Sequence, residues 1–250
     1  MSPAHAHAMA SPDFLVDPYI DPDSGLLRNL VGAQTQRALD EAEGALSFAR
    51  LVQLVDHPVK PTGDLEELRE IHRHLFQDVY TWAGELRTVD IRKNEEGAQF
   101  FLPVSMIERA AMFAAKELRD DNELQGLPRN EFIERLAYHY DAFNYIHPFR
   151  EGNGRTQRVF WSRIARAAGW QLDWRAVRGS TNDRASRAAS DQRDFAPLHD
   201  MFDRVVTAAK PQREFDAAWR GLEHARLAFR TIDVKTGEKP DTLDEKARDE

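Results

Sequence analysis

Residues 147–158 read His-Pro-Phe-Arg-Glu-Gly-Asn-Gly-Arg-Thr-Gln-Arg and separate two stretches with helical periodicity. In the first stretch, apolar residues recur at helical spacing from about Asn130 onwards: Phe132, Leu136, Tyr140 and Phe143. The second stretch continues the pattern until Gly169 ends it: Val159, Phe160, Ile164 and Ala167. Because Pro148 interrupts the periodicity, the sequence predicts two helices joined by a short loop that contains glycine.

Gly152, Asn153 and Gly154 stand directly before the second predicted helix. A helix N-terminus presents backbone N–H donors and the positive end of the helix dipole, and glycine lets an anion come close. Arg155 and Arg158 follow on the first turn, where their guanidinium groups suit phosphate oxygens. A lone glycine pair usually marks an ordinary turn, and a lone arginine pair is usually solvated charge. Their combination at one helix start favours a phosphate site.

Glu151 and His147 add a carboxylate and an imidazole to this site. A carboxylate beside phosphate is unfavourable unless a cation lies between them, and one carboxylate plus phosphate oxygens commonly hold Mg²⁺. The simpler interpretation of Glu151 is a surface residue or a partner for Arg150. With an ordinary pKa of about 6.5, neutral His147 can accept a proton from a hydroxyl nucleophile. A lone histidine is more often structural, but His147 lies only four residues before Glu151.

Periodicity predicts further helices on both sides of the motif. One covers residues 34–55 with an apolar face: Ala38, Ala42, Leu46, Ala49, Leu51 and Leu54. Another follows Pro61, is capped by Thr62 or Asp64, and carries a second apolar face: Leu65, Leu68, Ile71, Leu75 and Phe76. Two more are predicted over residues 107–118 and 194–206. The alternation between Thr88 and Leu102, with a turn at residues 94–97, predicts a short β-hairpin. The fold class is therefore mainly α.

The composition of the 250 residues restricts the classes of function. The net charge of −8 and pI of about 5.6 argue against bulk binding to nucleic acids or anionic membranes. The absence of cysteine excludes disulfides, thiol catalysis and Cys-ligated zinc. No stretch approaches the ~20 apolar residues of a membrane span and residues 1–12 lack a secretory pattern, so we expect a cytoplasmic protein. We expect residues 1–13 to be flexible, residues 14–206 to form one domain, and residues 207–250 to form a helix and a polar tail.

The motif carries a specific resemblance to a known family. Residues 147–158 match the Fic signature, His-x-Phe-x-Asp/Glu-Gly-Asn-Gly-Arg-x-x-Arg, at every fixed position, and residues 72–93 are similar to the family's segment leading into its flap. The resemblance covers about residues 14–206. It implies a Fic fold, a helical bundle with a short β-hairpin flap and the motif between two central helices. The activity it implies is AMPylation, in which AMP passes from ATP to a Ser, Thr or Tyr hydroxyl of a target protein.

The resemblance also implies a role for each residue of the motif. His147 would deprotonate the target hydroxyl, Phe149 would seat the loop in the core, and Glu151 would bind Mg²⁺ between the α- and β-phosphates. Residues 152–154 would form the anion hole, with Arg155 and Arg158 on the β- and γ-phosphates. The flap would pair with the target backbone as an added strand, and it comprises Thr88, Val89, Asp90, Ile91, Arg92 and Lys93.

The resemblance raises the question of control, because many Fic proteins carry an inhibitory helix with the pattern Ser/Thr-x-x-x-Glu-Gly/Asn. The nearest candidates, at residues 62–67 and 81–86, do not end in Gly or Asn. We read residues 62–67 as a capped helix start. The chain therefore resembles the stand-alone Fic toxins that a small separate antitoxin restrains, some of which modify type II DNA topoisomerases. A secreted effector that needs no restraint is the alternative.

Other activities remain as alternatives. Transfer of UMP or another nucleotide stays open, because the residues that contact the base are not readable from the sequence. Phosphotransfer is disfavoured, since relatives with that activity have a lysine in the loop and a non-acidic residue before it, whereas Glu151 and Gly154 are present here. Removal of AMP usually relies on the missing inhibitory glutamate. A non-catalytic nucleotide-binding module would not need His147, and direct nucleic-acid binding through residues 163–187 is the weakest alternative.

Overall fold

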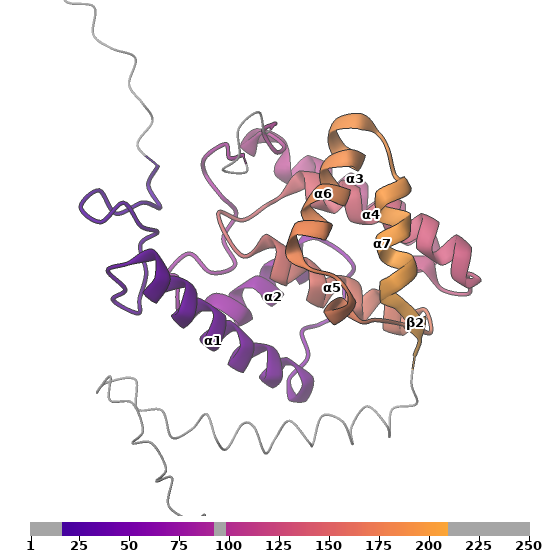
Figure 1. Cartoon of the computed structure of the whole chain (residues 1–250), viewed down its shortest axis with the longest axis horizontal. Coiled ribbons are helices and arrows are strands. Elements are labelled where there is room, and N and C mark those ends of the chain that lie inside the picture. The colour runs from indigo at the N-terminus through magenta and orange to yellow at the C-terminus, as the bar shows by residue number, and fades with distance from the viewer. Residues whose placement is uncertain (1–16, 93–98, 210–250) are drawn as a thin grey trace, which may run out of the picture. The chain divides into compact units, whose positions relative to one another are not determined.

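The computed structural model describes residues 17–92 and 99–209 of the chain. The helices in these residues are α1 (Gln36–Asp56), α2 (Leu65–Phe76), α3 (Ile107–Asp120), α4 (Arg129–Ile146), α5 (Asn153–Ala167), α6 (Gly179–Gln192) and α7 (Ala196–Val205). Short 3₁₀ segments connect some of them: η1 (Val104–Met106), η2 (Asn122–Leu124) and η3 (Trp174–Ala176). Two strands, β1 (Trp170–Leu172) and β2 (Val206–Ala208), pair antiparallel. The mainly helical fold class is confirmed (Figure 1).

Helices α4 and α5 form the centre of the bundle. α5 contacts α2, while α4 contacts α3, α5, α6 and α7. Aromatic rings fill the space between the two central helices: the centroid of Phe143 lies 5.3 Å from that of Phe160 and 5.4 Å from that of Trp161. All three rings are buried. This packing fixes the end of α4 and the start of α5, and residues 147–152 lie between them.

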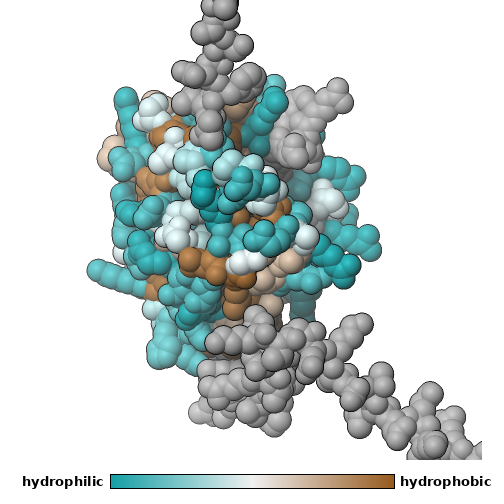
Figure 2. Space-filling view, turned by 90° about the vertical axis from the view of Figure 1, so that its left-hand side faces the viewer, coloured by the Kyte–Doolittle hydropathy of each residue, from teal (hydrophilic) through white to brown (hydrophobic). Residues whose placement is uncertain are grey.

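Helix α1 forms where the sequence predicts it, but its predicted apolar face is only partly correct: Leu54 is buried and Leu46 packs against the core. Ala38, Ala49 and Leu51 are exposed, and the buried residues are Leu39, Glu43, Ser47 and Leu54. Polar side chains point inward here because they bind polar groups of the neighbouring elements rather than an apolar core. The outer face of α1 instead exposes Phe48, Leu51 and Val55. The side of the molecule that carries α1 is mostly hydrophilic with separate apolar patches (Figure 2).

The start of α2 confirms the interpretation of residues 62–67 as a capped helix. Asp64 is the N-cap, and its carboxylate accepts hydrogen bonds from the N–H groups of the first turn. The Glu67 carboxylate turns back to accept from the N–H groups of Thr62 at 3.0 Å and Gly63 at 2.7 Å. Glu67 is also paired with Arg163 of α5 at 2.7 Å. The capping residues therefore tie α2 to α5.

Residues 93–98 of the predicted hairpin lie outside the described ranges, and Lys93 is among them. The two sides of the hairpin meet at an antiparallel bridge between Arg92 and Phe100, where the N–H of Phe101 donates to the carbonyl of Ile91 at 3.0 Å. The sequence did not predict the β1–β2 pair, which places residues 206–208 in a strand directly after α7. The expected flexible residues 1–13 and the expected C-terminal helix and tail beyond residue 209 are likewise outside the described ranges. None of the described helices is long and apolar enough to cross a membrane.

Arg87 joins the flap to the central helices. Its side chain is fully buried, and its guanidinium donates to the carbonyls of His147 at 2.8 Å, Val89 at 2.9 Å and Leu102. Its backbone N–H donates to the carbonyl of Pro148 at 2.9 Å. Burial lowers the pKa of the guanidinium. One buried cation thus connects both sides of the hairpin to the loop that follows α4.

Replacing Arg87 by Met should destabilise the fold and loosen the flap. Several buried carbonyls would lose their donor at once, so we expect the free energy of unfolding to fall by about 3 kcal/mol or more. Arg87→Lys should lie between Met and the wild type, because a lysine cannot reproduce the planar fork. Urea denaturation measures the change, and hydrogen exchange at Leu102 reports on the flap. The exposed Arg92→Met serves as control, with an effect within about 0.5 kcal/mol; equal effects of both substitutions would contradict this role.

Candidate functional site

His147 is the residue at which α4 ends. It adopts a left-handed conformation with φ 45°, and its ring stacks on Phe101 with centroids 3.6 Å apart. The ring Nδ1 lies 3.1 Å from the carbonyl oxygen of Asn144. Because a carbonyl only accepts hydrogen bonds, this contact places the ring proton on Nδ1 and gives Nε2 the lone pair. The ring is therefore held in the tautomer that a proton acceptor at Nε2 requires.

Asn153 holds the loop between the two central helices in shape. Its side chain is buried, with Oδ1 accepting from the N–H of Phe149 at 2.9 Å and Nδ2 donating to the carbonyl of Phe149 at 2.8 Å. Phe149 is itself buried and stacks on the ring of His72 at 4.0 Å. The amide of Asn153 is thus used inside the loop, so the group that it can offer to an anion is its backbone N–H.

Gly152 brings the loop against α2. It has φ 80°, and a Cβ at this position would lie 2.5 Å from the ring of Phe76. Both observations require glycine. A Cβ on the exposed Gly154 would meet open space. Residues 153–155 begin α5, and the first N–H groups of a helix have no acceptor within it. The start of α5 can therefore bind an anion, and the approach to it is open at Gly154.

Glu151 lies beside this helix start, and its side chain is exposed. One carboxylate oxygen accepts from the N–H of Gly152 at 2.8 Å and lies 4.0 Å from the guanidinium of Arg155. Among the described residues, no group of three or more His, Cys, Asp or Glu side chains could hold a metal ion. Glu151 as a single exposed carboxylate beside an anion site fits Mg²⁺ held jointly with phosphate oxygens, rather than a cage made by the protein alone.

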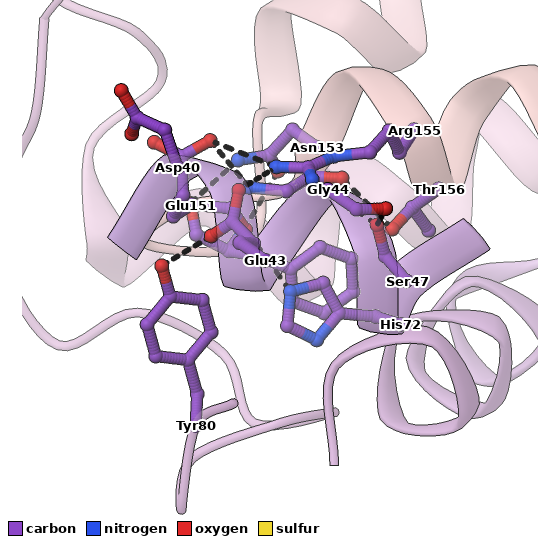
Figure 3. Close-up of polar contacts among 12 residues, drawn as sticks. Asp40, Glu43, Gly44, Ser47, His72, Tyr80, Glu151, Asn153, Arg155 and Thr156 are labelled. Carbon is purple, nitrogen blue, oxygen red and sulfur yellow. Dashed lines mark hydrogen bonds and ion pairs between the residues drawn. The ribbon is translucent and has the colours of Figure 1, made fainter. Parts of the chain in front are cut away.

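The two arginines of the motif are held by different parts of the chain. Arg155 is paired with Glu43 of α1 (Figure 3). Its guanidinium lies 4.8 Å from the ring centroid of Phe76. Arg158 lies 5.5 Å from the indole of Trp174 in η3. The structure thus places both cations along α5 near its start, each supported by a partner outside the motif.

His72 supports the loop from α2. Its Nδ1 accepts from the N–H of Gly84 at 2.7 Å, so Nε2 carries the proton and donates to the carbonyl of Glu151 at 3.0 Å. Burial lowers the pKa of His72 to about 3, and the hydrogen bond to the Glu151 carbonyl only partly opposes the effect of burial. His72 is therefore a neutral histidine that positions the backbone of Glu151.

A groove opens between the flap, the end of α4 and α6. It is lined by residues 99–101 of the flap, by Asn144 and Tyr145, and by α6 residues that include Ser190 and Asp191. Because Phe101 also stacks on His147, this groove lies beside the site. It combines aromatic surface with hydrogen-bonding groups. The sequence did not reveal it, since its walls come from three segments that are far apart in the chain.

Glu43 is a residue of the site that the sequence analysis missed. It is followed by Gly44, as the inhibitory pattern requires, but the position four residues earlier is Leu39 instead of Ser or Thr. It also pairs with Arg155 rather than with Arg158, the arginine that an inhibitory glutamate contacts in the family. The available signal was the spacing: Glu43 follows Leu39 by four residues, so the two share one face of the helix.

The stability of the fold should fall in acid because of His72. An unfolded histidine titrates at about pH 6.5, so below that pH the unfolded chain binds a proton that the folded chain excludes until about pH 3. The free energy of unfolding should therefore decrease by up to about 1.4 kcal/mol per pH unit over this window. His72→Gln keeps a donor and an acceptor, and it should lower stability at pH 7 and reduce this slope, of which a part remains because burial also lowers the pKa of His139 and His74. Urea unfolding at pH 7 and pH 5 tests it, with the exposed His57→Gln as control; a wild-type slope in His72→Gln would exclude His72 as the source.

Comparison with known proteins agrees with this geometry. Residues 62–165 match the Fic/DOC family. The chain is 34% identical over 193 residues to the probable protein adenylyltransferase Fic of Escherichia coli, which covers 77% of this chain and 94% of that protein. It is 40% identical over 170 residues to the protein adenylyltransferase VbhT of Bartonella schoenbuchensis, covering 68% of this chain but only 35% of VbhT.

Solved structures show the same fold. The N-terminal Fic domain of a Bartonella quintana effector with bound ADP superposes with a TM-score of 0.71 at 29% identity, covering 77% of this chain and 95% of that chain. BepC of Bartonella tribocorum with bound AMPPNP gives a TM-score of 0.71 at 25% identity, covering 77% and 97% of the two chains. The helical bundle with the motif between α4 and α5 is thus the Fic fold, and the chain belongs to the Fic/DOC family.

Proposed function

We propose that this chain is a protein adenylyltransferase that transfers AMP from ATP to a hydroxyl group of a target protein. The observation that carries the proposal is the relation between His147 and the start of α5. A histidine with its lone pair on Nε2 ends one central helix, and an anion-binding helix N-terminus with two arginines begins the next. A proton acceptor and a phosphate site are thereby joined by a loop of five residues, 148–152.

The reaction follows from these two parts. Nε2 of His147 accepts the proton of a Ser, Thr or Tyr hydroxyl as its oxygen attacks the α-phosphorus of ATP. A bond forms between that oxygen and the α-phosphorus, the bond from the α-phosphorus to the bridging oxygen breaks, and pyrophosphate leaves. The N–H groups at the start of α5 bind the phosphate oxygens, with Arg155 and Arg158 placed for the β- and γ-phosphates. Mg²⁺ held by Glu151 and the phosphates would neutralise charge on the polyphosphate.

The groove beside the flap is the place for the nucleoside. Phe100 and Tyr145 offer aromatic surface to a base, and Ser190 and Asp191 offer hydrogen-bonding groups. ADP and AMPPNP are bound in two of the similar structures. Adenine is therefore the base that we propose, and UMP transfer is the alternative that a comparison of ATP with UTP as donor would distinguish.

The flap is the place for the target. Arg87 fixes residues 88–92 relative to His147. A target strand paired with the flap would therefore be held at a fixed position relative to the proton acceptor His147. Edge pairing uses backbone groups, and it therefore demands little of the target sequence. A type II DNA topoisomerase is the target class that we would test first, on the basis of the resemblance to the stand-alone toxins.

His147→Ala should abolish transfer while leaving ATP binding intact. We expect the transfer rate to fall by at least about 10²-fold, because no other group takes over as the base. The protein is incubated with ATP, Mg²⁺ and a cell lysate, and peptides are analysed by mass spectrometry. The wild type and the exposed His57→Ala should place an AMP-sized increment on one target, and His147→Ala should not.

Other results of the same experiment would correct the proposal. A UMP-sized increment would change the donor, and a phosphate-sized increment would replace nucleotidyl transfer by phosphotransfer. ATP binding without any increment, in a preparation shown to be free of partner proteins, would favour a non-catalytic nucleotide-binding module. Undiminished transfer by His147→Ala would remove His147 as the base.

The activity of this chain is proposed to be restrained by a small separate antitoxin that supplies an inhibitory helix. In support, no Ser/Thr-x-x-x-Glu-Gly/Asn pattern occurs in the chain, and Arg158, which such a glutamate would bind, is held here through the face of Trp174. A secreted effector role is the alternative. This alternative also rests on the absence of the inhibitory pattern from the sequence.

Arg158→Ala should reduce inhibition by the antitoxin. It should also weaken binding of the γ-phosphate, because the same side chain is proposed to bind both. An affinity pulldown from the native host identifies the small partner, and transfer is then measured with and without it. The inhibition of wild-type protein should be reduced at least about tenfold in the variant, because an ion pair at the centre of the contact is lost. Arg166→Ala, on a later turn of α5, is the control. Purification without any small partner, or full inhibition of Arg158→Ala, would overturn this part of the proposal.

A further inference from the structure

Two residues of α1 hold the guanidinium of Arg155. Glu43 and Ser47 lie one turn apart on the buried face of the helix, with 8% and 4% of their surfaces exposed. The Glu43 carboxylate accepts from Nη2 of Arg155, and Oγ of Ser47 accepts from Nη1 at 3.3 Å. These contacts span more than 100 positions of sequence, and Figure 3 shows both side chains directed from α1 at Arg155.

The position of Glu43 is itself fixed. The hydroxyl of Tyr80 donates to the other oxygen of the Glu43 carboxylate. Burial raises the pKa of Tyr80, and the hydrogen bond to Glu43 raises it further. The hydroxyl therefore stays protonated and remains a donor. With one oxygen bound by Tyr80 and the other by Arg155, Glu43 has little freedom to turn. The carboxylate is a rigid support rather than a mobile surface charge.

The opposite side of the guanidinium is also supported. Arg155 lies over the ring of Phe76 at 4.8 Å, and the same ring packs beneath Gly152 in the anion-binding loop. Arg155 is therefore held against the loop from below by an aromatic ring and from α1 by two acceptors. Its side chain nevertheless keeps 36% of its surface exposed. A guanidinium has five N–H donors, so donors remain for a ligand after Glu43 and Ser47 have each taken one.

We propose that Glu43 and Ser47 are positioning residues that hold Arg155 in place for the phosphates beyond the α-phosphate of the bound nucleotide. An arginine side chain that is free in solution loses rotamer entropy when it binds a phosphate, and a side chain already held in place loses less. Helix α1 is then a part of the nucleotide site although it lies outside the motif. The inference rests on the proposed function for the identity of the ligand, and it concerns how one of its groups is oriented.

Glu43 could instead compete with the phosphates for Arg155, and the two roles predict opposite changes in nucleotide affinity when Glu43 is neutralised. If the carboxylate competed with the phosphates for Arg155, its neutralisation would strengthen polyphosphate binding. If it supports Arg155, neutralisation weakens binding of ligands with a β-phosphate and leaves AMP unaffected. The exposure of Arg155 and the two hydrogen bonds that hold Glu43 favour support, because binding then needs no rupture of a buried ion pair.

The test compares AMP with ADP and AMPPNP by isothermal titration calorimetry on the full chain. Glu43→Gln should lower the affinity for ADP and AMPPNP about tenfold, a coupling of the size found within one hydrogen-bond network, and leave the affinity for AMP unchanged. Ser47→Ala should act in the same direction with a smaller effect. Glu41→Gln, the same change on the exposed face of α1, should leave all three affinities unchanged.

Controls separate positioning from loss of structure. Introduced into Arg155→Ala, the Glu43→Gln change should cause no further loss of ADP affinity, because the arginine that it positions is absent. Thermal unfolding checks that each variant is folded. If Glu43→Gln does not fold, the comparison is made with Ser47→Ala. An unchanged or increased ratio of ADP to AMP affinity in Glu43→Gln would overturn the inference. Failure of the wild type to transfer AMP would refute the proposed function alone, since the ratio of affinities is measured without transfer.

Discussion

The hydrogen bond from His72 to the carbonyl of Glu151 is the interaction on which the arrangement of the site depends. The ring is buried and neutral, so it can bridge two backbone groups without introducing a charge into the core: Nδ1 takes the N–H of Gly84, and Nε2 gives its proton to the loop. Gly84 begins the segment that leads into the flap. One ring therefore sets the distance between the anion-binding loop and that segment, and α2 carries the ring.

Arg87 continues the same construction three residues further on. Its backbone N–H binds the carbonyl of Pro148, and its guanidinium binds the carbonyl of His147 together with both sides of the flap. The proposed phosphate site and the proposed target-docking segment are thus both anchored to the backbone of residues 147–151. A displacement of this short loop would move His147, the start of α5 and the flap together, and the dense packing of Phe149 and Asn153 within the loop opposes such a displacement.

The sequence was informative wherever a signal is local. Helical spacing located α1, α2, α4 and α5, and the twelve residues of the motif could be interpreted because the chemistry they suggest lies within one turn and one helix start. The supports of the site could not be predicted, because His72 reaches Glu151, Arg87 reaches His147 and Glu43 reaches Arg155 across 60 to 112 positions. The buried face of α1 was predicted only in part, at Leu46 and Leu54, for the same reason. An apolar pattern predicts burial against a core, whereas Glu43 and Ser47 are buried against another polar group.

The two arginines of the motif differ in how firmly the protein holds them. Arg155 makes an ion pair with Glu43, whose carboxylate is buried, and also donates a hydrogen bond to Ser47. Arg158 rests on the indole of Trp174, a contact worth about 0.5–2 kcal/mol. A partner that redirects Arg158 therefore displaces a ring contact, whereas one that redirects Arg155 breaks an ion pair and a hydrogen bond. The proposed control by a separate inhibitory helix is accordingly easier through Arg158, while Arg155 would stay in place for the nucleotide.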